Sequence, residues 1–329
     1  MSSSAAARST AAMAARRSPH VRFRRFAWFV LGFAVLVIIW GAVVRATGSG
    51  AGCGNHWPLC NGDVVPLAPR TATVIEYAHR LTSGLILVFV AMLWGAAVRT
   101  FPPGHGARRA AMWSAIFVVI EAGIGAGIVL LQLVEGNASA LRAGYIAVHL
   151  INTMFLVAAI TATVWWADHV PASGVEPSIR TSRRLLLAAM AAMLFVSASG
   201  AVVALGDTLF PQASLSAGLA ADFDPASHFL IRLRMWHPLL AATVGISLVW
   251  LATRAAAFDE PALAGPGRWM VWLVAAQVAL GAINLVTLAP LALQMAHLAV
   301  ANILWIALVW AYLAHRDAGR DARARAASA

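Results

Sequence analysis

The sequence contains no lysine, and it has few charged residues of any kind. All 24 basic residues are arginines, and charged residues make up 11% of the 329-residue chain. Soluble domains contain about 25% charged residues, and the mean hydropathy of this chain is +0.77, so a soluble globular protein is excluded. The net charge of +11 does not indicate nucleic-acid binding, because the arginines lie in short segments between apolar runs, as is typical of anchoring at a membrane surface.

Eight apolar segments follow one another along the chain. Each is long enough to cross about 30 Å of hydrocarbon as a helix that rises about 1.5 Å per residue. A lipid-exposed backbone must satisfy its own hydrogen bonds, which leaves helices for such segments. We therefore expect an all-α integral membrane protein with eight transmembrane helices, near residues 26–45, 74–98, 111–133, 143–166, 184–205, 230–253, 268–288 and 291–314.

The arginines also indicate which side of the membrane each segment faces. They are concentrated in an N-terminal tail (residues 1–25), in alternate loops, and in a C-terminal tail (residues 316–329). Basic residues mark the cytoplasmic side, so both termini are expected inside the cell. The loop that contains Cys53 and Cys60 then lies on the outer face, where oxidising conditions favour a disulfide. A structural role and a redox role for this pair both stay open.

The chain repeats itself after four spans. The tetrapeptide Gly-Ala-Val-Val ends the first span at residues 41–44 and recurs at residues 200–203 in the fifth span. An even number of spans per repeat gives both halves the same topology, with an axis along the membrane normal. We expect two tandem four-helix bundles related by a pseudo-two-fold axis, a first half at residues 26–170 and a second half at residues 171–315.

Four of the ten histidines lie inside spans, one on each even-numbered helix, at similar depth near the outer end: His79, His149, His237 and His297. A single such histidine is more often a hydrogen-bonding residue between helices, but polar residues inside a membrane are expensive and mark function. Two imidazoles from two helices can hold a porphyrin iron from both faces. Zinc would need three or four ligands at one point, often with cysteine, so the pairwise layout favours two heme sites.

An acid accompanies only one of the histidines. Glu76 precedes His79 by three residues and shares its helix face, whereas Arg234 occupies the equivalent position before His237. This asymmetry suggests that the first half performs chemistry, in which Glu76 removes protons or stabilises a cation on the ring. The alternative is that Glu76 orients a ligand or pairs with Arg80.

Three arginines are candidates to bind heme propionates, because arginine binds carboxylates well: Arg80, Arg232 and Arg234. For Arg80 the alternative is a side chain that extends to the membrane interface. Glu121, in the third span, has Gln277 as its counterpart in the seventh, and we expect Glu121 to make a hydrogen bond between helices. The small residues around Gly123 and Gly281 are interpreted as helix packing.

Together, several motifs resemble those of bacterial heme A synthases with a cysteine pair in the outer loop. The matching segments are residues 41–50, Cys53, residues 57–62, residues 76–80, His149, residues 236–238 and residues 297–298. The resemblance extends from about residue 26 to residue 312. It implies an oxidoreductase of the bacterial plasma membrane that converts a methyl group of heme O to a formyl group and so supplies heme A to cytochrome oxidase.

The resemblance also implies a role for each matched residue: Glu76 as the catalytic residue, His79 and His149 facing the substrate heme O, His237 and His297 as iron ligands of a bound heme b, and Cys53–Cys60 as an outer-loop disulfide that passes reducing equivalents. The implied partners are heme O synthase and the oxidase assembly. The sequence leaves open the membrane electron donor or acceptor and the oligomeric state, a homo-oligomer included.

Two features depart from the family pattern. The outer loop between spans five and six lacks the second cysteine pair that some members have, and His56 stands before Trp57 where an acid is expected. The main alternative function is a two-heme, b-type electron-transfer subunit that oxidises quinol, which needs no acid beside one heme. A heme transporter is a third hypothesis that the duplication allows.

Overall fold

The structure is a computed structural model, and it describes residues 2–168, 179–257 and 261–326. Within these ranges the chain forms helices and no strand. The elements are α1 (Ser2–Ala46), η1 (Ser49–Ala51), α2 (Thr71–Thr100), α3 (Gly106–Leu130), α4 (Ala140–Asp168), α5 (Ile179–Leu209), α6 (Leu215–Phe223), α7 (Phe229–Arg232), α8 (Trp236–Ala257), α9 (Pro261–Val286) and α10 (Leu291–Ala326).

Eight spans in the described part of the chain are long and apolar enough to cross a membrane, which confirms the predicted number. The fourth span, Ala140–Asp168, agrees closely with the expected segment at residues 143–166. Helix α1 begins at Ser2 and α10 ends at Ala326, so helix continues through much of both segments that we expected to be tails.

The sixth span differs from the single helix that hydropathy predicts. Helix α7 ends at Arg232, a turn follows, and α8 begins at Trp236. Pro238 explains the break, because its ring would clash with the carbonyl group of residue 234 if the helix continued, while proline is tolerated in a first turn. Helix α6, in the preceding loop, was not predicted; the Ser214 hydroxyl caps it by accepting from the amide of Ala217.

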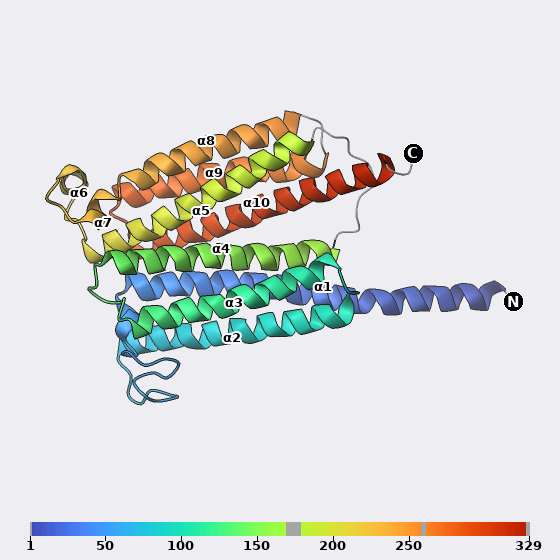
Figure 1. Ribbon diagram of the computed structural model, residues 1–329, viewed down its shortest axis with the longest axis horizontal. Helices are drawn as coiled ribbons and strands as arrows, with labels where there is room; N and C mark the ends of the chain where they lie inside the picture. Colours follow the sequence, from blue (N-terminus) through green and yellow to red (C-terminus); the bar gives the residue numbers. More distant parts are fainter. Residues whose placement is uncertain (1, 169–178, 258–260, 327–329) are drawn as a thin grey trace.

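The helices form two neighbouring groups. Figure 1 shows α1 to α4 together on one side and α5, α8, α9 and α10 on the other, with α4 at the boundary. Both termini lie at one end of the bundle, while α6, α7 and the loop after α1 lie at the opposite end. Below, this opposite end is called the loop end.

Helix α4 is the central span. Half of its most apolar window is buried, compared with 11–33% for the other spans. It packs against α10, where the indole of Trp305, only 1% exposed, donates to the carbonyl group of Met154 at 2.8 Å. Large apolar side chains on other helices point outward, as a bilayer requires; Phe195, Ile246 and Trp272 are 70–74% exposed. The core therefore lies between the two groups of helices.

Replacing Trp305 with alanine should destabilise the protein by about 3–5 kcal/mol, because it leaves a cavity at the contact between α4 and α10. Thermal unfolding of the detergent-solubilised protein measures the effect. The matched control is Trp272→Ala on the outward-facing surface of α9, which should shift the melting temperature little. Similar shifts for the two variants would contradict the placement of Trp305 in the core.

Candidate functional site

A cavity of about 1030 Å³ is lined by residues from both groups of helices. It reaches the loop end, where Trp57, Pro58 and Glu76 line it. Pockets for small molecules and cofactors usually occupy about 300–1,000 Å³, so this cavity is large enough for a bulky ligand. All four histidines singled out in the sequence line it: His79, His149, His237 and His297.

Each of these histidine rings faces a glycine on the preceding helix. A Cβ atom added to the glycine would lie within 4 Å of the ring carbon Cε1 in every case: Gly41 to His79 at 3.0 Å, Gly125 to His149 at 4.0 Å, Gly200 to His237 at 2.8 Å and Gly281 to His297 at 3.2 Å. A side chain at Gly41, Gly200 or Gly281 would displace the facing histidine ring, so glycine is required at these three positions. The glycines that the sequence suggested for helix packing thus also make room for imidazoles.

The histidines form two pairs. His79 and His149 face the cavity from α2 and α4 of the first group of helices, and His237 and His297 face it from α8 and α10 of the second. The Nδ1 atoms of His79, His149 and His297 are buried and have no hydrogen-bond partner in the part of the chain that the structure describes. Buried nitrogen atoms are normally satisfied, so this set of rings has capacity left for a ligand.

A carboxylate lies beside His149 and an amide beside His297. Glu121 accepts hydrogen bonds from Asn152 Nδ2, at 2.5 Å, and from the Thr153 hydroxyl, which confirms the predicted bond between helices α3 and α4. Its Oε1 atom lies 3.4 Å from His149 Nδ1, too far for a well-formed hydrogen bond.

In the second group, Gln277 Nε2 lies 3.1 Å from His297 Nε2. A ring nitrogen that accepts this hydrogen bond uses the lone pair that an iron would take. The Nδ1 atom of His237 is instead bonded to the Ser199 hydroxyl at 2.9 Å.

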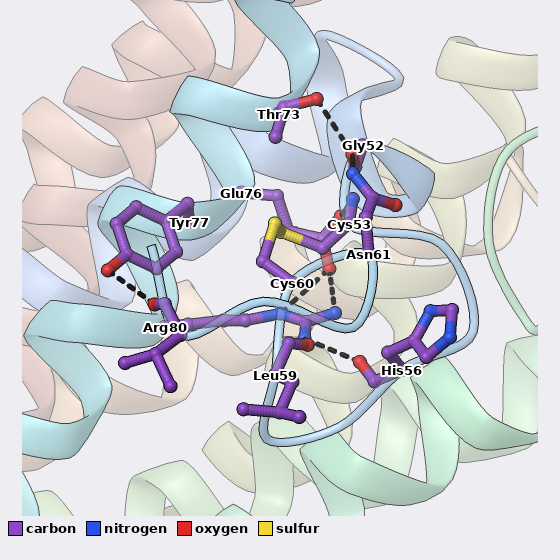
Figure 2. The surroundings of a disulfide bond; sticks show 11 residues. Gly52, Cys53, His56, Leu59, Cys60, Asn61, Thr73, Glu76, Tyr77 and Arg80 are labelled. Carbon is purple, nitrogen blue, oxygen red and sulfur yellow. Dashed lines mark hydrogen bonds and ion pairs between the residues drawn. A yellow bond between two sulfur atoms is a disulfide. The ribbon is translucent and has the colours of Figure 1, made fainter. Parts of the chain in front are cut away.

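Glu76 is buried, with 4% of its surface exposed, and is held by two donors (Figure 2). The amide of Cys53 donates to Oε2 at 2.8 Å. The Arg80 guanidinium donates to Oε1 from Nε at 3.0 Å and from Nη2 at 2.5 Å. The pairing of Glu76 with Arg80, which the sequence left open, is therefore present, and it fixes the carboxylate at the cavity wall.

The loop above Glu76 is fastened to α2. Cys53 and Cys60 form a disulfide, which confirms the expected bond. The Thr73 hydroxyl donates to the carbonyl group of Gly52 at 2.7 Å. A Cβ atom on Gly52 would lie 2.4 Å from the backbone of Ala72, so only glycine lets the loop approach the helix this closely.

Arg80 joins the same loop. Its Nη1 atom donates to the carbonyl groups of His56 and Leu59, each at 2.5 Å. One guanidinium thus links the loop to the carboxylate of Glu76 (Figure 2). A salt bridge inside such a network is more strongly positioned than an isolated surface pair.

Arg234 and Arg232 are placed differently from one another. Arg234 lines the cavity, and its guanidinium pairs with Asp222 at 2.8 Å and with Asp207 at 3.3 Å. Arg232 is exposed at the end of α7 and is not among the residues that line the cavity. The structure therefore brings Arg80 and Arg234, but not Arg232, to the cavity.

Two cavity arginines were missed in the sequence. Arg45 donates to the Ala204 carbonyl at 2.5 Å, to the Thr208 hydroxyl at 2.6 Å and to the Gln294 side chain at 2.9 Å, so α1 reaches across to α5 and α10. Arg142, 5% exposed, donates to two loop carbonyls in residues 135–137. The sequence did contain a signal for them, because Arg45 and Arg142 lie at the loop ends of their spans, where arginine is otherwise scarce.

Residues 24–309 match the COX15-CtaA family, which is described as cytochrome oxidase assembly protein. The chain belongs to this family. This confirms the resemblance that the sequence motifs indicated.

The individual relatives have one of two names, protoheme IX farnesyltransferase or heme A synthase. The chain is 43% identical over 293 residues to a protein named protoheme IX farnesyltransferase from Thermus thermophilus, a match that covers 88% of this chain and 48% of that protein. It is 30% identical over 213 residues to a heme A synthase from Halalkalibacterium halodurans, covering 64% of each. It is 32% identical over 147 residues to a heme A synthase from Alkalihalophilus pseudofirmus, covering 44% of this chain and 46% of the relative. The matches thus span 46–64% of these relatives' lengths.

Replacing Gly200 with alanine should displace the His237 ring, because the new Cβ atom would lie 2.8 Å from Cε1. The fold should persist, since the ring is the movable end of a side chain. We expect heme affinity to fall about tenfold, the lower end of what disturbing a ligand's orientation costs, as measured by heme absorbance per protein after purification. Gly32→Ala on α1, with no atom within 4 Å of its Cβ position, is the control, and equal heme content in both variants would contradict the role of Gly200.

Proposed function

We propose that this chain is a heme A synthase, which oxidises a methyl group of heme O to a formyl group and so provides heme A for cytochrome oxidase. The single observation that supports it most is the asymmetry between two similar halves. Both offer a pair of imidazoles to one cavity, but the residue three positions before the first histidine of the pair is a buried carboxylate, Glu76, in the first half and Arg234, which pairs with Asp222 and Asp207, in the second. Membership of the family and the names of two relatives point the same way.

The first half is the proposed substrate site. Heme O would lie between His79 and His149, whose Nδ1 atoms both lack a hydrogen-bond partner among the described residues. The nearby Glu121, fixed by Asn152 and Thr153, is positioned to orient His149 through that nitrogen, as carboxylates commonly do for iron-binding histidines. A small shift of the ring would bring the 3.4 Å separation into hydrogen-bonding range.

The second half is the proposed site of heme b. His237 and His297 are the ligands, and the bound heme would supply electron transfer next to the substrate site. The Ser199 hydroxyl orients His237 through Nδ1, which leaves Nε2 for iron. At His297, the amide of Gln277 would have to give up its hydrogen bond to Nε2.

Glu76 is the proposed catalytic residue. Oxidation of a methyl group to a formyl group breaks two C–H bonds, passes electrons to an acceptor such as the proposed membrane electron carrier and develops charge at the edge of the ring. A carboxylate there can accept a proton or stabilise positive charge. The two donors to Glu76 restrict its position, since the Cys53 amide holds one oxygen and Arg80 holds the other. Precise placement of this kind is a large part of enzymatic rate enhancement.

The heme propionates are better matched to Arg45 and Arg142 than to the arginines that the sequence suggested. Arg80 and Arg234 are already paired with carboxylates. Among the described residues, Arg45 and Arg142 donate hydrogen bonds only to neutral oxygen atoms, and both line the cavity. Their charge therefore remains available for a ligand carboxylate.

The proposal includes the topology. The two halves are taken as tandem four-helix bundles related by a pseudo-two-fold axis, which the repeated glycine–histidine contacts support. Both termini lie at the same end (Figure 1), and the arginine distribution assigns that end to the cytoplasm. The protein is then a multi-pass protein of the bacterial plasma membrane, with the disulfide loop on its outer face.

The partners we propose are heme O synthase, the oxidase assembly and a membrane electron carrier. The name of the Thermus relative fits a link to farnesylation of heme, since this chain matches only part of that protein. It also raises a second candidate function, farnesyl transfer to heme b, alongside the quinol-oxidising cytochrome considered above. The three functions differ in the heme they leave behind: heme A, heme O, or unchanged heme.

Replacing Glu76 with glutamine should abolish heme A formation and leave the heme of the second half in place. The measurement is extraction of heme from membranes that make heme O but no heme A, followed by chromatography with mass detection. Asp63→Asn, in the same outer loop, is the control and should convert heme O normally. Heme A from the Glu76→Gln variant would contradict the catalytic assignment. In membranes that make only heme b, heme O produced by the wild type would favour farnesyl transfer.

Replacing both Cys53 and Cys60 with serine should reduce heme A formation without abolishing it. The disulfide holds the amide that binds Glu76, but Thr73 and Arg80 still fasten the loop. The same heme analysis measures the effect, with Glu76→Gln as the reference for complete loss. Complete loss in the serine variant, with an intact fold, would instead support obligatory electron transfer through the cysteines.

A further inference from the structure

The cavity extends further beyond the histidines in the first half than in the second. On α2 its lining continues to Ile86 and Leu87, seven and eight residues past His79, or about 11–12 Å along the helix axis. On α8 the last lining residue is Leu239, two residues past His237 and about 3 Å along the axis. These helices occupy equivalent positions in the repeat, so the difference is specific to the first half.

The next helix in each half shows the same difference. On α3 the lining reaches Val118, seven residues before Gly125, whereas on α9 it stops at Gln277, four residues before Gly281.

The fourth helix of each half agrees, and the first does not distinguish them. The lining reaches Leu156, seven residues past His149, on α4, but only Asn302, five residues past His297, on α10. On α1 and α5 the lining reaches equivalent depth. The extra depth is therefore formed by α2, α3 and α4, and below it is called the deep extension.

The deep extension is lined by apolar side chains. Its walls include Ile86, Val118 and Leu156, and each of these side chains is only 5% exposed. The extension therefore lies inside the bundle among apolar side chains, an environment suited to an apolar chain. An apolar chain that enters the deep extension is removed from water. Removal of apolar surface from water is the main driving force for burying such groups.

In the second half, side chains fill the corresponding space. Gly245 lies eight residues past His237, where the first half has Leu87. A Cβ atom on Gly245 would lie 3.4 Å from Val274 Cγ1 and 3.7 Å from Val278 Cγ2. Small residues allow helices to approach closely, so α8 and α9 meet where α2 and α3 leave a passage.

We infer that the deep extension binds the isoprenoid tail of heme O and selects heme O over heme b. The inference rests on the proposed function. The tail and the propionates lie on opposite edges of the heme O ring. Arg45 and Arg142 line the cavity at the loop end, and the extension lies at the other end, so the two would bind opposite edges. A tail held in the extension fixes the rotation of the ring and thereby which methyl group faces Glu76.

The test is a heme titration of the purified full-length protein, with heme O and heme b compared as ligands by absorbance and by quantification of retained pigment. At the proposed substrate site in the first half, the wild type should bind heme O at least about tenfold more tightly than heme b, a difference of about 1.4 kcal/mol. Val118→Phe should weaken the binding of heme O alone and so reduce this preference to about twofold or less. Val274→Phe, the matched change in the second half, should keep the wild-type preference.

A second matched pair of variants keeps the test conclusive if a variant of the first pair fails to fold. Leu156→Phe should lose the preference, and Leu304→Phe, at the equivalent position of α10, should keep it. Retention of tightly bound heme in the second half identifies a folded variant. Equal weakening of heme O and heme b by Val118→Phe and Leu156→Phe, or an unchanged preference, would overturn the inference, since the extension would then not be specific for the tail.

Failure of the inference can be distinguished from failure of the proposed function. Binding preference is measured without conversion, so a wild type that prefers heme O in a Val118-dependent way but forms no heme A would refute the synthase and leave the tail site standing. A wild type that forms heme A while Val118→Phe keeps its preference for heme O would refute the tail site alone.

Discussion

The contact between a glycine on one helix and a histidine ring on the next is the feature on which the arrangement of the site depends. An imidazole inside a membrane is expensive unless it faces protein or a cavity. Gly41, Gly200 and Gly281 have no side chain, which leaves room for the ring to face protein. A Cβ atom at these positions would lie only 2.8–3.2 Å from the ring. Because the rings are fixed by helix packing, the depth and pairing of the histidines follow from the backbone and not from a bound ligand.

The two halves share this scaffold but not its charges. In the first, Glu76 is fastened between Arg80 and a disulfide loop. In the second, the equivalent place belongs to Arg234, which pairs with two aspartates, and α6 and α7 replace the cysteine loop. The same duplication of helices can thus hold two similar ligands in chemically different surroundings. This is the distinction expected between a site that transforms its ligand and one that retains it.

Much of this could be predicted from the sequence, because the governing rules are local. Hydropathy predicts the spans, and the place of Cys53 and Cys60 in a loop expected on the oxidising outer face predicts the disulfide. Pro238 also indicates the break before α8, but hydropathy averaged over a window does not detect a break in a helix. The partners of Arg45 could not be predicted, since they lie 159 to 249 residues away along the chain. The unequal depth of the cavity likewise depends on how closely whole helices approach one another.

The disulfide need not carry electrons to matter for chemistry. Cys53 contributes its backbone amide to Glu76, and an amide can hold a carboxylate only if the loop that carries it is itself immobile. The cross-link, the Thr73 bond to Gly52 and the Arg80 bonds to two loop carbonyls all restrict that loop. A misplacement of about 1 Å can cost an enzyme roughly a hundredfold in rate. The loop's rigidity is therefore sufficient reason for the cysteines to lie next to Glu76, the proposed catalytic carboxylate.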